Sequence, residues 1–404
     1  MFFKDVFVTL LLGTLAAAWQ CGSPTTSAVN LTVKPVDTKS LKLVAQYKHN
    51  SLQQISSDGN LLLFYESSKP VRTYTLTAGG KGTANQPDAN TDVLRVVERG
   101  SGRELGRLGV GFFPEDIQFM PGTQRVFYKE PEQVDGKLEW RIKIWDLANG
   151  EARECSSANA MSQSFSLIDA QHVLNIMRQA GKGERLAILA LPECSQTKLS
   201  ASVHSEPMAG SIWFSPSRKE MAYVSGQKVV VRNTATLDVT KEINPPSGMN
   251  FGENAIYTPD GKFLLVVAAN TIFDKPDTKR FLYFYDTTNY QLARQLDVTA
   301  WSPPVVNDEV ALKSSVIGTA MAVAPDSRTI AVGYTKDQSG TQQAHVVLYD
   351  LETGKELGRA VHPAIKENRD DPFAAQIGKL VFTPDGKHLL SSTNDTLVWE
   401  VPSR

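Results

Sequence analysis

The chain has 404 residues, of which 41% are hydrophobic and 21% are charged. This balance is typical of a folded globular protein and excludes an intrinsically disordered one. The 42 Lys and Arg residues nearly equal the 43 Asp and Glu residues, which gives a formal net charge of −1. A chain without a basic excess has no field that attracts a polyanion, so the sequence argues against nucleic acid as a partner.

The N-terminus has the layout of a secretory signal peptide over residues 1–18. Lys4 precedes the apolar run Val6–Ala18, which ends in small residues, as in an export signal. The run is too short to cross a bilayer comfortably, and no later segment resembles a transmembrane span. We therefore expect an exported protein, periplasmic or extracellular, with cleavage between residues 18 and 28 and a flexible linker over residues 19–39.

Cys21 offers an alternative to a freely diffusing protein. A cysteine just after an apolar signal can carry a lipid, and the protein would then be tethered to a membrane. Trp19 and Gln20 are bulky at positions where bacterial lipoprotein signals have small residues. This argues against lipidation at Cys21, without removing it as an alternative.

The rest of the chain repeats one short pattern: an apolar run, a tight turn and a second apolar run. Several of the turns read Pro-Asp-Gly, in which Pro presets φ, Asp bonds its own backbone and Gly accepts a positive φ. A second hairpin pattern follows the first, for example around DLETGKELGR at 350–359. The repeated units begin near Gln53, Asp116, Ser164, Ile212, Ala255, Thr319 and Lys379.

The two hairpins together make a unit of four strands, which we name a, b, c and d in chain order. Repetition of such a unit is typical of a β-propeller, in which each four-stranded sheet is one blade. We predict an all-β fold, a seven-bladed β-propeller of four-stranded antiparallel blades, as a single domain over residues 40–404. An open β-sandwich is the alternative, but it does not explain seven copies of one turn pattern.

The seventh unit predicts how the ring closes. Its first three strands are expected near 379–383, 387–392 and 396–401, and the sequence then ends without a d strand. Residues 40–48, which precede the first unit, are similar to a d strand. We predict that this N-terminal strand completes the last blade, which leaves no open sheet edge.

At these residues the chain resembles the WD40/YVTN-like β-propeller repeat family, over most of residues 40–401. Trp145-Asp146 is the WD dipeptide, and variants of it occupy the same place in other units. The Gly-His pair of a regular WD40 repeat is missing, so the chain is more similar to exported bacterial propellers with degenerate repeats. The resemblance implies the fold much more than an activity.

Three histidines, His49, His204 and His362, lie in equivalent connections between units. Three imidazoles on one face would suit a metal ion. Their units are not mutual neighbours, however, so we expect a structural histidine that bonds a neighbouring turn.

Cys155 and Cys194 are predicted to lie on an outer strand and in a turn of the next unit. In an oxidising compartment these two residues can form a disulfide. Two unpaired thiols are the alternative.

The excess length of the chain falls in the b–c and d–a connections. These connections leave the same face, because the strands alternate in direction. Binding residues concentrate on loops held by a rigid scaffold, and aromatic residues and Met are enriched in interface cores. We therefore predict a candidate binding face carried by these connections, and packing over the blades is the alternative role for its residues. The segments are 66–91, 129–138, 270–279, 298–318, 335–343 and 361–378, and the large apolar candidates are Phe112, Phe113, Met249, Phe251, Trp301 and Phe373.

Two functions follow from this pattern. The first is a non-catalytic, exported binding or protein-interaction scaffold that holds a protein, peptide or glycan on the b–c/d–a face. The alternative is a quinoprotein-dehydrogenase-like or lactonase-like propeller enzyme or enzyme subunit. The sequence contains no Gly-x-Ser-x-Gly elbow, haem motif, HExxH or EF-hand loop, and no ring of inward carboxylates or histidines. It thus offers no catalytic, cofactor-binding or metal-ligating residues, and the scaffold is the preferred hypothesis.

Overall fold

The computed structural model describes residues 40–48, 50–66, 92–110, 114–134, 137–155, 164–179, 183–200, 208–270, 278–301, 320–338, 341–366 and 375–403. They belong to one compact unit, Thr38–Arg404. Residues 1–39, which hold the predicted signal peptide, the linker and Cys21, lie outside the described residues.

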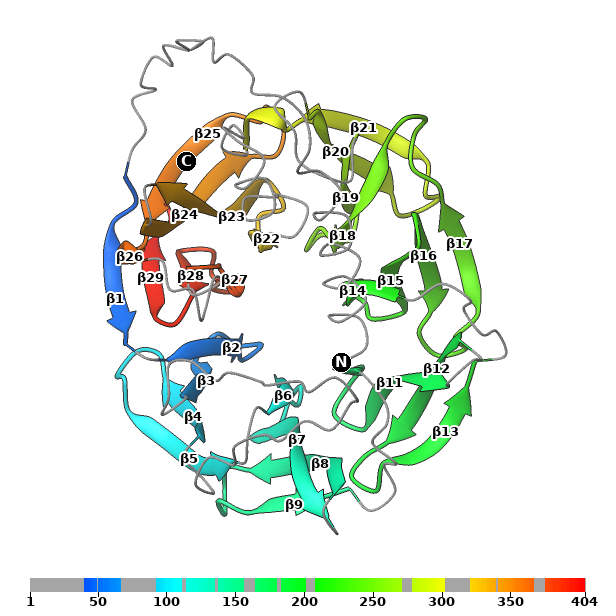
Figure 1. Ribbon diagram of the computed structural model, residues 1–404, viewed down its shortest axis with the longest axis vertical. Helices are drawn as coiled ribbons and strands as arrows, with labels where there is room; N and C mark the ends of the chain where they lie inside the picture. The colour runs from blue at the N-terminus through cyan, green and yellow to red at the C-terminus, as the bar shows by residue number, and fades with distance from the viewer. Residues whose placement is uncertain are drawn as a thin grey trace, which may run out of the picture. The chain divides into compact units, whose positions relative to one another are not determined.

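Seven antiparallel sheets are arranged as blades around a common centre, which confirms the predicted seven-bladed β-propeller (Figure 1). Blades 1 to 3 consist of β2 Ser51–Ile55, β3 Leu61–Glu66, β4 Asp92–Glu98 and β5 Glu104–Val110; β6 Glu115–Phe119, β7 Arg125–Val134, β8 Lys137–Asp146 and β9 Ala152–Glu154; and β10 Ser164–Leu167, β11 His172–Gln179, β12 Gly183–Ala190 and β13 Ser195–Leu199.

Blades 4 to 7 follow the same plan, with strand a innermost and strand d at the rim. They consist of β14 Met208–Phe214, β15 Glu220–Ser225, β16 Lys228–Asn233 and β17 Val239–Ile243; β18 Asn250–Tyr257, β19 Phe263–Ala269, β20 Arg280–Asp286 and β21 Leu292–Asp297; β22 Met321–Val323, β23 Thr329–Gln338, β24 Thr341–Asp350 and β25 Glu356–Val361; and β27 Lys379–Phe382, β28 His388–Ser392 and β29 Thr396–Glu400. A 3₁₀ turn, η1 Thr299–Trp301, follows blade 5, and a short strand, β26 Ile365–Lys366, pairs with β24.

The N-terminal strand β1 Leu43–Tyr47 supplies the outer strand of blade 7, as predicted. It pairs antiparallel with β29, and Leu43 lies opposite Trp399 (Figure 1). The backbone N–H of Leu41 also donates to the carbonyl of Arg359 on blade 6, at 2.8 Å. One segment of the chain therefore joins the last two blades and closes the ring.

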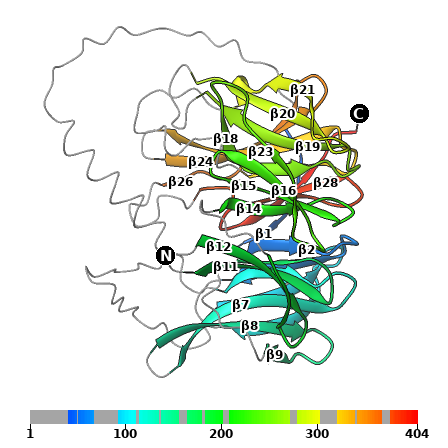
Figure 2. The ribbon, with the colours of Figure 1, turned by 90° about the vertical axis from the view of Figure 1, so that its right-hand side faces the viewer.

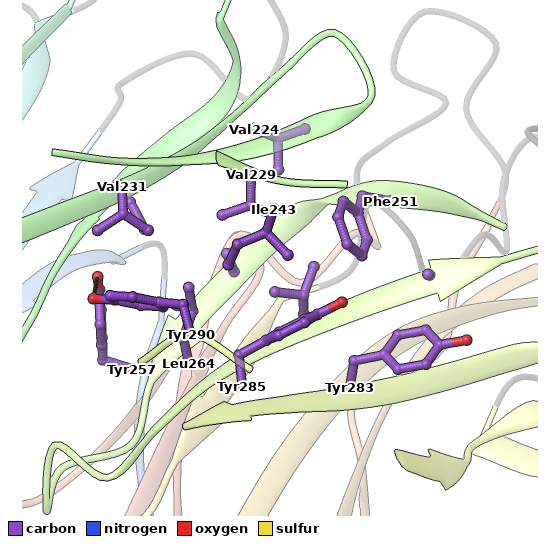
Figure 3. Close-up of a cluster of buried hydrophobic side chains, with 14 residues drawn as sticks. Val224, Val229, Val231, Ile243, Phe251, Tyr257, Leu264, Tyr283, Tyr285 and Tyr290 are labelled. Atoms are coloured by element: carbon purple, nitrogen blue, oxygen red, sulfur yellow. Dashed lines mark hydrogen bonds between the residues drawn. The ribbon is translucent and has the colours of Figure 1, made fainter. Parts of the chain in front are cut away.

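The hydrophobic core lies between the blades. Each blade presents apolar side chains on both faces, because strands b and c are covered on both sides. The cluster between blades 4 and 5 includes Val229 and Val231 from β16 and Leu264 and Tyr285 from β19 and β20 (Figure 3). Rigidity of the ring thus depends on contacts from one blade to the next.

The repeated a–b turns also form contacts between blades. Gly59 has a φ of +75°, and a Cβ at this position would lie 2.5 Å from Cδ of Pro384 in the turn of blade 7. The same arrangement places Gly261 beside Pro216 and Gly386 beside Pro325, at 3.8 Å or more. Arg218 and Ser327 hold the same left-handed position in blades 4 and 6. Only at Gly59 does the proline of the preceding blade come so close that Gly is needed for space as well as for its backbone.

Candidate functional site

The structure places three of the six candidate side chains of the predicted binding face in or against the core. Trp301 is 3% exposed and stacks on Tyr349 with the ring centroids 4.2 Å apart. Phe251 is 8% exposed and meets the edge of Tyr285, while Met249 packs partly buried against the same cluster. Trp301 and Phe251 therefore stabilise the contacts between blades and are not free to meet a partner. The other three candidates, Phe112, Phe113 and Phe373, lie outside the described residues.

Two of the connections expected to be loops are extended hairpins instead. Segment 129–138 lies mostly in β7 and β8, and segment 335–343 lies mostly in β23 and β24. Each of these strands has 10 residues, so each hairpin continues the sheet beyond its blade. Figure 2 shows both hairpins reaching out on the same side of the ring, which is the face of the b–c and d–a connections. We call this face the hairpin face.

A disulfide joins Cys155 to Cys194, with the Cα atoms 5.3 Å apart. Cys155 follows β9 at the rim of blade 2, and Cys194 lies in the turn between β12 and β13 of blade 3. Both side chains are buried, at 3% and 2% exposure. The covalent bond therefore links two neighbouring blades.

His362 is the one connection histidine that the described residues include. Its Nε2 lies 2.7 Å from Oγ of Ser391, which also accepts a hydrogen bond from Nε1 of Trp399 at 2.8 Å. Burial lowers the pKa of His362 to about 4, against an opposite and smaller effect of Asp395. The imidazole is therefore neutral at physiological pH and serves packing between blades 6 and 7.

A hollow of about 320 Å³ lies between the a–b turns of blades 4 and 5, on the side opposite the hairpin face. The turn Ser215–Ser217 and Glu220 line it from blade 4, and Tyr257 and the turn at Asp260 line it from blade 5. We call it the blade 4–5 pocket. Sequence reasoning missed this site.

A hydrogen bond between the two blades fixes a carboxylate at this pocket. The hydroxyl of Tyr290 donates to Oε2 of Glu220 at 2.6 Å. The hydroxyl of Tyr257 lies 3.2 Å from that of Tyr290, and Figure 3 shows the two rings side by side. Burial raises the pKa of both tyrosines, and at Tyr290 the hydrogen bond to Glu220 raises it further. Both hydroxyls therefore stay protonated and can donate to an acceptor.

Within the described part of the chain, no group of three or more His, Cys, Asp or Glu side chains has the arrangement of a metal site. The same residues include no helix of the length and apolar character that a membrane crossing needs.

No family model matches the chain, and no curated protein matches it. Among solved structures, 791 chains match, as expected of a fold that carries many functions. One is a chain from a crystal structure of the mitotic checkpoint complex, with a TM-score of 0.53 and 11% sequence identity. That match covers 94% of this chain and 100% of the other. At this identity the likeness concerns the fold.

Proposed function

We propose that the protein is an exported, non-catalytic scaffold that binds a protein partner on its hairpin face. The observation that carries this proposal is the pair of extended hairpins, β7–β8 on blade 2 and β23–β24 on blade 6. A closed ring of packed blades holds both at fixed positions, and a rigid display of this kind reduces the entropy lost on binding. The structural neighbour from a protein complex is consistent with such a role.

Charged residues line the base of one hairpin. Nζ of Lys129 lies 3.1 Å from Asp116 and 3.0 Å from Glu115, and it is 5.0 Å from the ring centre of Trp140 on β8. Lys129 is only 2% exposed, so these contacts are partly desolvated and restrict the hairpin. A restricted hairpin is better suited to recognition than a solvated loop.

Export is the second part of the proposal. The N-terminal pattern of residues 1–18 supports it, and so does the disulfide, because such bonds persist in oxidising compartments and are rare in the cytosol. Mass spectrometry of the mature protein tests this part. An N-terminus between residues 18 and 28 is expected, a lipid on Cys21 would show tethering, and an intact residue 1 would refute export.

Shortening a hairpin tests the scaffold. Replacing residues 132–139 by Asn-Gly removes three strand pairs, from Glu132↔Glu139 to Val134↔Lys137, and leaves Pro131 opposite Trp140 across a two-residue turn. Affinity purification from the source cells should recover fewer partners with this variant than with the unaltered chain. Lys387→Ala, in the a–b turn of blade 7 on the opposite side, is the matched control. Equal recovery by both variants would refute the hairpin face as the binding surface.

A further inference from the structure

We propose that the blade 4–5 pocket binds an organic cation, an ammonium or guanidinium group, through the carboxylate of Glu220. This site lies on the opposite side of the ring from the hairpin face. Cation binding at this pocket therefore does not depend on whether the hairpin face binds a protein partner.

The charge of the pocket is the first argument. Its lining includes the carboxylates of Glu220 and Asp260 and several hydroxyls, and none of the lining residues is basic. Asp260 has a partner in Nζ of Lys262, at 3.4 Å. Glu220 has no ion-pair partner among the residues that the structure describes. A cation from outside the chain would supply the missing positive charge.

The geometry of the carboxylate is the second argument. Tyr290 donates to Oε2 of Glu220, and the hydroxyl of Tyr257 lies 3.2 Å from that of Tyr290, so the hydroxyl that orients the carboxylate is itself held in place. In the described structure Oε1 accepts no hydrogen bond. A carboxylate has lone pairs on both oxygens, and a fixed carboxylate with one oxygen available is prepared to accept from an N–H donor.

Glu220 and Tyr257 are exceptions at their positions in the repeated unit. Glu220 is the first residue of its strand b, and the corresponding residues are Leu61, Arg125, His172, Phe263, Thr329 and His388. Tyr257 is the last residue of its strand a, and the corresponding residues are Ile55, Phe119, Leu167, Phe214, Val323 and Phe382. The repeat therefore folds without a carboxylate or a phenol at these positions. Both occur together where the pocket lies, so the repeat in general does not require them, and the oxygen of Glu220 that Tyr290 leaves free is the feature that a ligand would use.

The donor set and the size define the class of ligand. A protein site for a calcium ion supplies about six to eight oxygen ligands, whereas two lining carboxylates, one of them paired with Lys262, suit a single positive group. A hollow of about 320 Å³ accommodates one Lys or Arg side chain or a small amine. The cation can belong to a free small molecule or to a basic side chain of a protein.

Calorimetric titration of the full chain tests the proposal. The probes are Nα-acetyl-arginine amide, Nα-acetyl-lysine amide and the capped tripeptide Nα-acetyl-Gly-Arg-Gly amide, with uncharged Nα,Nε-diacetyl-lysine amide as the negative control. We expect saturable binding of the cations and none of the neutral analogue. Tighter binding of the tripeptide than of the arginine amide indicates a protein source, and equal binding indicates a small molecule.

Two variants and a control assign that binding to the pocket. Glu220→Gln removes the charge with little change in shape and should weaken cation binding by about tenfold or more. Ser217→Lys, which leaves Glu220 intact, supplies a cation from the exposed turn and should also compete with the probe. Glu242→Gln, an exposed residue of β17 in the same blade, should leave binding unchanged. The proposal is refuted if no cation binds at millimolar concentration, or if the Ser217→Lys chain binds as well as the unaltered one.

Discussion

Tyr290 of blade 5 occupies the same position in its c–d turn as Cys194 of blade 3. Both residues have a left-handed backbone, with φ of 56° and 52°. Both side chains also reach the preceding blade: Cys194 bonds to Cys155, and Tyr290 donates to Glu220. Leu237 occupies this position in blade 4. It also has a positive φ, and its side chain packs in the hydrophobic cluster between blades 3 and 4. In the remaining blades with this turn the position is Gly102, Gly150 and Gly354, also with positive φ.

The strain of a non-glycine residue at this position is therefore offset by an interaction between its side chain and the preceding blade. A left-handed conformation costs an L-residue roughly 1–2 kcal/mol. A disulfide, a buried leucine and a charge-assisted hydrogen bond each contribute more than this in favourable cases.

Removing the disulfide with Cys155→Ser/Cys194→Ser should lower the free energy of unfolding. The bond closes a loop with a sequence separation of 39 residues, for which the chain-entropy model gives about 4 kcal/mol. Urea denaturation of the oxidised chain and the double variant measures the difference. Adding a reductant should destabilise the first and leave the second unaffected. If the reductant lowered the midpoint of both equally, the disulfide would not be the cause.

Tyr290→Phe should destabilise the chain by about 1.5–3 kcal/mol, because it removes a hydrogen bond to a carboxylate. Tyr283→Phe is the matched control: Tyr283 is 3% exposed in the same cluster, and the described residues provide no hydrogen-bond partner for its hydroxyl. Thermal denaturation of both variants measures the difference. Equal stability of the two would show that the bond to Glu220 contributes nothing.

His362 should make stability depend on pH between about 6.5 and about 4. The folded pKa is about 4 and the ordinary value is 6.5, so in this range the unfolded state binds a proton that the folded state does not. Stability is then complete above about 6.5 and falls as the pH decreases, by on the order of 3 kcal/mol at about 4. Urea titrations at several pH values should show a smaller decrease for His362→Gln. A parallel decrease in both chains would assign the dependence to other groups.

Gly59→Ala should cost more than Gly102→Ala, although both glycines have positive φ. A Cβ at Gly59 would lie 2.5 Å from Pro384, whereas nothing lies within 4 Å of a Cβ at Gly102. The second variant therefore reports about 1–2 kcal/mol of backbone strain alone, and the first adds overpacking of about 1–3 kcal/mol. Chemical denaturation measures both. Equal losses would mean that the turn of blade 7 moves aside.

Deleting residues 40–48 should leave blade 7 with three strands and expose the edge of β29. An unpaired edge is a template for pairing with another chain, so we expect self-association that rises with concentration. Light scattering of the deleted and the full chain, both carrying the same N-terminal tag, measures it. A monomeric deleted chain of unchanged stability would contradict closure by β1.

The propeller and its closure could be predicted from the sequence because they depend on local signals. A Pro-Asp-Gly turn between two apolar runs identifies a hairpin within a dozen residues. The seventh unit lacks a d strand, and residues 40–48 are an extra strand that can supply it. The role of Trp301 could not be predicted in this way. The turn Thr299–Trp301 directs its side chain back over Tyr349, and an aromatic residue beside a long connection is compatible with either packing or binding.

The blade 4–5 pocket depends on residues from different blades. Glu220 and Tyr290 are 70 residues apart, and only the packing of blade 5 against blade 4 brings them together. The sequence did contain a signal for this pocket. Tyr290 stands where other blades have the glycine of the c–d turn, and Glu220 is the one carboxylate among the residues that begin strand b. Aligning the seven units position by position, and marking where one blade departs from the rest, could have found both.

Strand β1 is synthesised first, but its partner β29 is synthesised last. The pairing of Leu43 with Trp399 is among the contacts of greatest sequence separation in the molecule, and contacts of this kind form slowly. Until residue 400 is available, the growing chain is an open row of blades with an unpaired strand at each end, which is the condition in which large β proteins associate wrongly. A chain cut short before β29 cannot form this contact, so the ring closes only when both β1 and β29 are present.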